Sequence, residues 1–309
     1  MNLFEQTINA VLANQQIYTV LRPVLEKEIL HSEFLRILNK AGVLQKLTFM
    51  GGTCLRSCYG FARLSEDLDF TGGFDFKKDD LQDIGTLLKK GIWQKYNLAL
   101  DILEPVKEEG NTHTWKVKII TSPERSDLPQ QRINIDVCML PSYERRPAML
   151  RNHYGLETGT SGLIIMAESL TEILADKIVA VAMRPNRVKN RDLWDIYQLK
   201  AHSIDLSADL VKQKLTDRQV DFSFFKRCYA ERLTHLQTQK QEFWREMQRF
   251  LNPEAFSGEF TDKLWWENLL YLLKDWGNIY TNQSIKDSKK QGSQKRCKDR
   301  GGKDEYPEG

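Results

Sequence analysis

The chain has 309 residues, of which 41% are hydrophobic and 28% are charged, a profile typical of a globular protein with a sizeable core. The net charge of +3 is uneven, because residues 286–303 contain eight Lys or Arg and two Asp and leave the rest of the chain slightly acidic. Bulk charge therefore does not predict nucleic-acid binding, and any contact with RNA has to come from local patches.

The chain has no run of about 18 or more apolar residues, and its start, MNLFEQTINAV, lacks a basic flank and a cleavage pattern. We therefore expect a cytoplasmic protein with no membrane partner. The odd, scattered set of five cysteines is typical of reduced thiols and lacks the spacing of a structural zinc site.

The first part of the chain is expected to be helical. Residues 3–15 and 20–41 carry apolar side chains at helical spacing, and Gly42 is well placed to end the second helix. The apolar residues 47–50 then predict a short buried strand.

A glycine turn follows this strand. Gly51 and Gly52 form the turn, and Thr53 opens a segment that is expected to be helical. Free backbone N–H groups at a turn before a helix can bind phosphate. A Gly-Gly turn alone is nevertheless uninformative, and the signal comes from the motif that lies next to it.

That motif is Arg63-x-Ser65-x-Asp67-x-Asp69, whose aspartates alternate with apolar residues. Alternation with period two puts Asp67 and Asp69 on one face of a strand. Two such carboxylates repel each other unless a cation lies between them, and Mg²⁺ or Mn²⁺ is the usual solution. Triphosphate beside a metal–carboxylate pair indicates nucleotidyl transfer from an NTP, although the pair alone could be the end of a surface strand.

Further strands are expected downstream. A helix is predicted over residues 79–96, and strands over residues 98–106, 114–121 and 131–140, with a hairpin turn at 108–111. In the last of these strands Asp136 is an acidic residue opposite an apolar face. It is either part of an acidic site or an edge-strand aspartate in water.

Residues 141–166 are expected to be irregular, and the character then changes to helix. Ser169 suits an N-cap for a helix that runs to Met183. Asp176 and Lys177 lie in the middle of this helix. Because consecutive helical residues point about 100° apart, we expect only one of them to face a cleft. Lys177 could contact a triphosphate, or the two could form a solvated pair.

A basic loop, residues 184–191, comes next and is the best internal candidate for phosphate or RNA contact, although charge runs are often only solvated. The helix that follows carries Asp192 and Asp195, three positions apart and therefore on one face. One of them could orient an attacking hydroxyl or hold Lys177, while Asp192 could simply favour its helix N-terminus.

The remainder is expected to contain helices over residues 205–215, 221–250 with a break, and 261–277, with their aromatic residues in the core. Residues 282–309 are polar, rich in Lys and Gly, and expected to form a disordered basic tail.

Taken together, these motifs resemble a known family. G-G-T-x-L-R at residues 51–56, followed by R-x-S-x-D-x-D-F at residues 63–70, is similar to the AbiEii/AbiGii toxins, within the nucleotidyltransferases that share the DNA polymerase β catalytic fold. Later motifs of the family match residues 175–177 and 191–196. The resemblance covers roughly residues 30–200.

The resemblance implies an α/β (α+β) fold with two domains before the tail. A polymerase β-like nucleotidyltransferase domain with a mixed sheet is expected over 1–166, and a helical domain over 167–281. The site residues that it implies, with NTP as substrate and Mg²⁺ or Mn²⁺ as cofactor, fall into three groups. They are Asp67, Asp69 and Asp136 as metal ligands; Gly51, Gly52, Thr53, Arg56, Arg63 and Ser65 as nucleotide contacts; and Lys177, Asp192 and Asp195, with Asp67 and Asp69, as catalytic residues.

The function implied is that of a toxin, paired with an antitoxin in a toxin–antitoxin or phage-defence system. It would transfer a nucleoside monophosphate to RNA, with the tRNA 3′ end as the expected acceptor. Two alternatives stay open: the same site acting on a small molecule or a protein, and a non-catalytic nucleic-acid-binding module. The intact Asp67 and Asp69 argue against the second.

Overall fold

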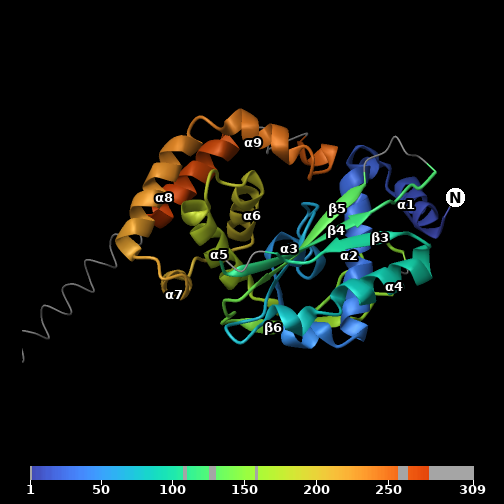
Figure 1. The fold of residues 1–309 in the computed structure, drawn as a ribbon. Helices are drawn as coiled ribbons and strands as arrows, with labels where there is room; N and C mark the ends of the chain where they lie inside the picture. Colours follow the sequence, from blue (N-terminus) through green and yellow to red (C-terminus); the bar gives the residue numbers. More distant parts are fainter. Residues whose placement is uncertain (1, 107–109, 125–129, 157–158, 257–263, 278–309) are drawn as a thin grey trace, which may run out of the picture.

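The computed structural model describes residues 2–106, 110–124, 130–156, 159–256 and 264–277. Its centre is a seven-stranded mixed sheet with the strand order β3-β4-β5-β2-β1-β7-β6, and helices flank this sheet (Figure 1). The mixed α/β fold predicted from the sequence is therefore confirmed. The strands are β1 (Thr48–Met50), β2 (Leu68–Thr71), β3 (Leu100–Leu103), β4 (Thr112–Ile119), β5 (Gln131–Cys138), β6 (Arg145–Met149) and β7 (Ile164–Glu168).

Parallel and antiparallel strand pairs alternate around the strands that carry the central motifs. β2 runs antiparallel to β1 and parallel to β5, while β1 runs parallel to β7. The outer pairs β3–β4, β4–β5 and β6–β7 are antiparallel. This arrangement places β2, with the Asp-x-Asp motif, in the middle of the sheet and directly beside β5.

The N-terminal helices follow the expected pattern. They are α1 (Leu3–Asn14), α2 (Arg22–Lys40), the short α3 (Gly51–Ser57) and α4 (Ile84–Tyr96), with 3₁₀ turns at Gln16–Leu21, Val43–Lys46 and Lys78–Leu81. α2 ends just before Gly42, whose φ of +76° lies in the left-handed region that favours glycine. The prediction for Gly42 is thus confirmed.

The prediction of irregular structure over residues 141–166 is wrong, because β6 and most of β7 fall there. β6, with the sequence RRPAM, is an edge strand whose side chains are mostly exposed, so that it lacks the alternation on which the prediction depended. Its Pro147 is tolerated because an edge strand needs fewer backbone donors. β7 has only five residues and also crosses the domain boundary expected at 166/167.

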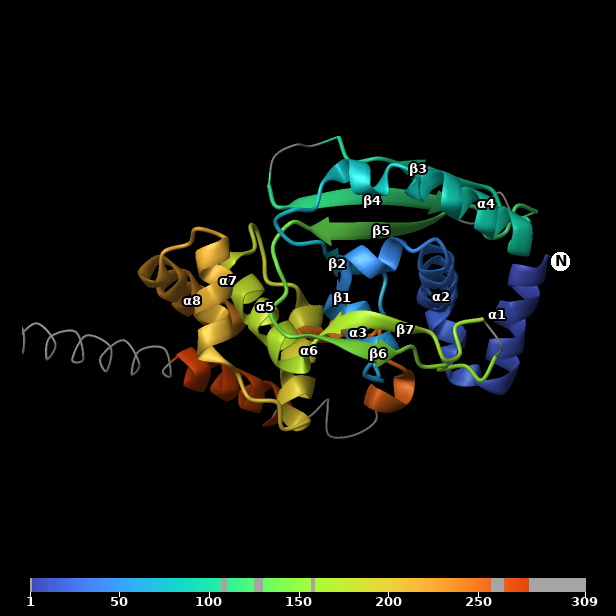
Figure 2. The ribbon, with the colours of Figure 1, turned by 90° about the horizontal axis from the view of Figure 1, so that it is seen from below.

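Helices gather at one end of the molecule, away from α1, α2 and α4, in both views (Figures 1 and 2). They are α5 (Leu170–Met183), α6 (Asn190–Ala201), α7 (Ala208–Asp217), α8 (Phe222–Leu236), α9 (Lys240–Met247) and a helical stretch over residues 264–277, with a 3₁₀ turn at Pro253–Phe256. Ser169 caps α5 by accepting from the Glu172 N–H, and the expected break between residues 221 and 250 is confirmed.

Aromatic residues fill the core of this helical part, as predicted. Phe243 packs on Trp265 and Trp266 with ring centroids 5.1 Å apart, and Trp265 stacks on Trp194 at 5.7 Å. Among the described residues, no helix is long and apolar enough to span a membrane. The expected tail, 282–309, lies outside the described residues.

Candidate active site

A cavity of about 620 Å³ lies between the middle of the sheet and the helices α5 and α6. Twelve residues were predicted from the sequence to act in one site, and the cavity brings most of them together. Those that line it are Gly51, Gly52, Arg63, Ser65, Asp67, Asp69, Asp136, Lys177 and Asp192. The other three, Thr53, Arg56 and Asp195, are buried and do not line it.

Three carboxylates meet on the sheet side of the cavity. Asp69 of β2 is paired in parallel register with Asp136 of β5, and Asp67 precedes β2 by one residue. Burial, followed by repulsion from Asp136 and Asp67, raises the pKa of Asp69 to about 6. Burial also raises the pKa of Asp136, although a hydrogen bond of 2.6 Å from the Thr114 hydroxyl opposes this effect.

The three carboxylates suit a divalent metal ion. They are hard oxygen donors, Asp69 and Asp136 lie on adjacent strands, and after burial their mutual repulsion is the next largest cause that raises the pKa of Asp69. Asp67 Oδ1 accepts a hydrogen bond of 3.1 Å from the Asn134 N–H, which fixes its position. By the chemistry of their oxygens these residues suit Mg²⁺ or Mn²⁺, although among the described residues the three carboxylates that lie within 4.8 Å of one another are those of Glu168, Glu172 and Asp176.

The two glycines are required by close contacts in the site. Gly51 has a φ of +74°, and a Cβ at this position would lie 2.6 Å from Asp69 Oδ2. A Cβ on Gly52 would lie 2.2 Å from Arg63 Nη2. The Gly-Gly turn therefore lets the backbone of α3 approach both the carboxylate cluster and the Arg63 guanidinium.

Thr53 and Arg56 hold the site together from behind. The Thr53 hydroxyl is hydrogen-bonded to Ser65 Oγ at 2.7 Å and to the Asp67 carbonyl. Arg56 Nε pairs with Glu28 Oε2 at 3.2 Å, and Glu28 Oε1 accepts from the Ser65 N–H at 3.0 Å. In these positions Arg56 braces the motif through Glu28, and Thr53 braces it through Ser65 and the Asp67 carbonyl.

A buried ion network forms another part of the lining. Arg63 donates from Nε and Nη2 to both carboxylate oxygens of Asp195, at 2.8 and 2.7 Å. Lys177 Nζ lies 2.8 Å from Asp195 Oδ2 and 2.8 Å from Asp192 Oδ1, and Arg184 Nη1 lies 2.7 Å from Asp192 Oδ2. Of the alternatives open for Asp192 and Asp195, the geometry thus matches the one in which they hold Lys177.

The charges in this network keep one another ionised. Although burial alone would lower it, the pKa of Lys177 is raised by Asp192 and Asp195. Burial would raise the pKa of both aspartates, but Lys177 and Arg184 lower that of Asp192, and Arg63 and Lys177 lower that of Asp195. Neither aspartate is therefore suited to accept a proton near neutral pH.

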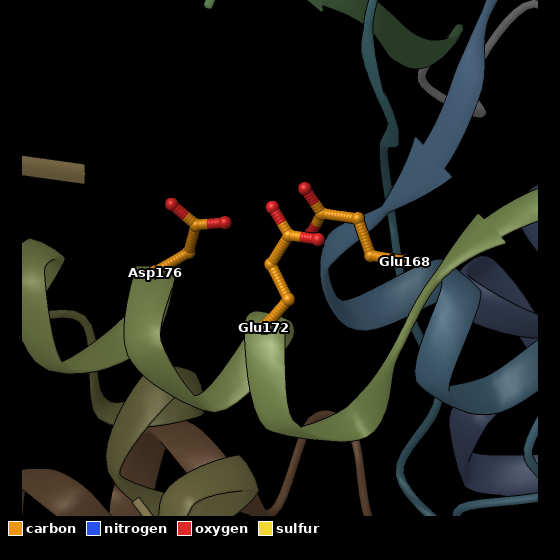
Figure 3. Close-up of side chains that lie close together, drawn as sticks. All are labelled: Glu168, Glu172 and Asp176. Atoms are coloured by element: carbon orange, nitrogen blue, oxygen red, sulfur yellow. The ribbon is translucent and has the colours of Figure 1, made fainter. Parts of the chain in front are cut away.

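A second acidic group lies along the same cavity, where Glu168 at the end of β7 and Glu172 and Asp176 from successive turns of α5 project side by side (Figure 3). Their oxygens lie within 4.8 Å of one another, which is close enough for a metal ion. Lys214 Nζ, however, lies 2.6 Å from Glu172, 2.9 Å from Asp176 and 3.4 Å from Glu168. The Lys214 ammonium group supplies the positive charge that a metal ion would otherwise supply. The three carboxylates and Lys214 therefore form a buried ion network.

Asp176 and Lys177 both line the cavity, which corrects the expectation that only one of them would. They reach it on different sides, because Asp176 binds Lys214 and Arg218 whereas Lys177 binds Asp192 and Asp195.

Sequence reasoning also missed parts of the lining. Glu168 and Arg218 carried no sequence signal, since they lie outside recognisable motifs. Lys189 was noted only as part of a basic loop, yet it lines the cavity, is exposed and makes no ion pair with a described residue. Its charge opposes the rise in the pKa of Asp69 and Asp136.

Comparisons with known proteins identify the family of this chain. The model of the family described as nucleotidyl transferase AbiEii toxin, type IV toxin–antitoxin system, matches residues 33–267. Among solved structures, MenT4, a nucleotidyltransferase toxin from Mycobacterium tuberculosis H37Rv, is 15% identical with a TM-score of 0.48, covering 86% of this chain and 98% of its own. JHP933 from Helicobacter pylori is 15% identical with a TM-score of 0.42, covering 88% of this chain and 97% of its own.

A search of the curated proteins gave no match. The family match spans well over half of the chain and includes each of the motifs from Gly51 to Asp195. This chain belongs to the AbiEii family of nucleotidyltransferase toxins.

Proposed function

We propose that the protein transfers a nucleoside monophosphate from an NTP to RNA, with the 3′ end of tRNA as the expected acceptor. One observation carries the proposal: the same cavity is lined by three carboxylates from β2, β5 and the residue before β2, and by the cations Arg63, Lys177, Arg184 and Lys189. A triphosphate beside a divalent metal ion needs both kinds of charge. The family implies an antitoxin as partner, in a toxin–antitoxin or phage-defence system.

In this proposal Asp67 and Asp69, with Asp136, hold Mg²⁺ or Mn²⁺. When bound, the metal activates the attacking hydroxyl and neutralises the leaving pyrophosphate. Gly51 and Gly52 bring backbone N–H groups of α3 close to this cluster. Ser65 is buried at the edge of the cavity, where Thr53 holds its hydroxyl.

The cations act on the phosphates in two ways. Lys177 and Arg63 lie in the wall, each bound to buried carboxylates, and offer the triphosphate a fixed positive surface. Lys189 is exposed at the cavity and makes no ion pair with a described residue, so that its ammonium group can bind a phosphate directly. Asp192 and Asp195 position Lys177 and do not act as bases.

The test is incubation of the purified protein with each of the four labelled NTPs, Mg²⁺ and purified tRNA. We expect label in the tRNA with wild type and none with Asp69→Asn. A panel of acceptors, comprising other RNAs, total protein and small-molecule alcohols, separates the proposed acceptor from the alternatives. Label that appears only on protein or on a small molecule would contradict an RNA acceptor, and label on nothing would contradict the transfer itself.

A further inference from the structure

A second hollow, of about 300 Å³, adjoins the candidate active site, and four arginines line it. We call it the arginine groove. Three segments enclose it: the start of α6, the loop before β2, and α9 together with the residues that follow α9. Its lining consists of Arg187, Arg191, Arg245, Arg249, Glu66, Glu242, Glu246 and Phe250. Arg191 lines both this groove and the cavity of the active site, so that the two are contiguous.

The groove is fixed to the catalytic motif by the backbone. The Leu64 N–H donates to the Phe250 carbonyl at 2.9 Å, and Glu66 stands between the motif residues Ser65 and Asp67. One wall of the groove therefore belongs to the segment that carries the metal-binding carboxylates. A chain lying in the groove would have its end beside them.

Cations outnumber carboxylates in this groove. Glu66 is shared by Lys27 at 2.9 Å, Arg191 at 3.2 Å and Arg249 at 3.7 Å. The lining has four arginines and three glutamates, an excess of one positive charge, and Lys27 offsets part of the charge of Glu66 from outside the groove. This excess contrasts with a chain that is slightly acidic outside residues 286–303.

The ion pairs of Arg187 and Arg249 in the groove are long, and the side chains of both are exposed. Arg187 lies 3.5 Å from Glu242 and 3.9 Å from Glu246, and its side chain is 64% exposed. Arg249 is 65% exposed. Arg245 is exposed and makes no ion pair with any described residue. In the buried network the corresponding distances are 2.7–2.8 Å, so that the groove's guanidinium groups keep donors free for a ligand.

Phe250 orients two of these groups. The guanidinium carbons of Arg191 and Arg249 lie 4.7 and 5.5 Å from the centre of its ring. Contacts of this kind hold the planar guanidinium group against the ring and leave its N–H edges for planar, bidentate partners such as phosphate. Phe250 itself is buried, so that its ring supports the guanidinium groups and is not available as an apolar anchor for a protein partner.

We propose that the arginine groove binds backbone phosphates of the acceptor RNA and so delivers the RNA's end to the carboxylate cluster. This inference rests on the proposed transfer to RNA and adds where the acceptor lies. The phosphate contacts come from Arg245 in α9, from Arg249 just after α9 and from Arg187. Arg191 links the groove to the cavity.

The test compares two double variants of the full chain. Arg245→Ala/Arg249→Ala removes two groove cations that are exposed. Lys226→Ala/Arg227→Ala is the matched control on α8: these cations also lie over phenylalanine rings, at 5.4 and 5.3 Å, but line a separate hollow between α8 and residues 264–277. Thermal melting checks that both variants fold. Binding of fluorescent tRNA is measured at several salt concentrations, followed by transfer kinetics.

We expect the groove variant to bind tRNA about tenfold more weakly near physiological salt, with a salt slope lower by about one for each lost phosphate contact. KM for tRNA should rise, while KM for NTP and kcat at saturating tRNA stay at the wild-type values. The control should match wild type throughout.

Four results would overturn the proposal. An unchanged salt slope in the groove variant, while wild type still labels tRNA, would refute the groove alone and leave the proposed function standing. An equal loss in the α8 control would show diffuse binding instead. Unchanged tRNA binding with weakened binding of polyglutamate would assign the groove to an acidic protein. If wild type labels no RNA at all, the proposed function fails together with the groove.

Discussion

Replacing Asp195 by asparagine tests whether the buried ion network is structural. Asp195 is 1% exposed and receives two hydrogen bonds from Arg63 and one close contact from Lys177. An amide of the same shape keeps one acceptor but loses the charge. Two buried cations would then face a neutral group, with only Asp192 left to hold Lys177.

Removal of one partner of a buried ion pair typically costs about 3–5 kcal/mol. Because asparagine keeps the shape and one acceptor, we expect a loss of about 3 kcal/mol, measured by urea denaturation followed by tryptophan fluorescence and circular dichroism. Asp205→Asn is the control: Asp205 pairs with Lys200 at 2.6 Å but is 86% exposed. An exposed pair of this kind contributes less than about 1 kcal/mol.

The pH dependence gives a second readout. Arg63 and Lys177 lower the pKa of Asp195 in the folded state below its unfolded value of about 3.9, although burial opposes them. The stability that this carboxylate contributes is therefore present above pH 4 and is lost as the pH falls through the folded-state pKa. The difference between wild type and Asp195→Asn should be full at pH 7 and shrink on acidification. A variant as stable as Asp205→Asn, or a difference that does not shrink in acid, would refute this reasoning.

Three other substitutions test the cavity. Asp136→Asn should raise the Mg²⁺ concentration needed for half-maximal transfer without lowering Tm, since it also relieves repulsion on Asp69; an unchanged Mg²⁺ titration would remove Asp136 from the ligand set. Gly51→Ala should abolish transfer because its Cβ would displace Asp69, whereas Gly73→Ala, with a similar φ of +80° but no atom within 4 Å, should only lose stability; equal activity in the two would contradict the contact. Lys189→Ala should raise KM for NTP and leave urea stability unchanged, and a KM at the wild-type value would show that Lys189 does not reach the triphosphate.

Much of the fold and of the sheet side of the site was predictable, because both depend on local patterns. The alternation around Asp67 and Asp69 predicted a strand, and the buried Leu68 and Phe70 confirm it. For Asp136 the alternation predicted only the face of the strand, while its assignment to the site came from the family resemblance; the register between β2 and β5 places it beside Asp69. In each case the sequence period alone fixes which face a side chain occupies.

What could not be predicted depends on contacts between distant segments. Nothing local in the sequence links Lys214 to Glu168, which are 46 positions apart, and their ion pair exists only because α7 packs on α5 beside the end of β7. The arginine groove has the same origin, since Phe250, three residues after the end of α9, accepts a hydrogen bond from Leu64 in the loop before β2. Arg56 combines both cases. Its motif was recognised from the sequence, but its ion-pair partner Glu28, on the distant helix α2, was not.

The spacing of the motifs has a packing explanation that no single motif reveals. Gly52 must lack a side chain because Arg63 Nη2 occupies the space a Cβ would need. Arg63 in turn is held there by both oxygens of Asp195, and Asp195 shares Lys177 with Asp192. The glycine turn, the Arg63 motif, the lysine of α5 and the aspartates of α6 are thus successive members of one chain of contacts. These contacts join the motif segment beside the sheet to α5 and α6, so that in the proposed function a change at any member should disturb phosphate binding through the others.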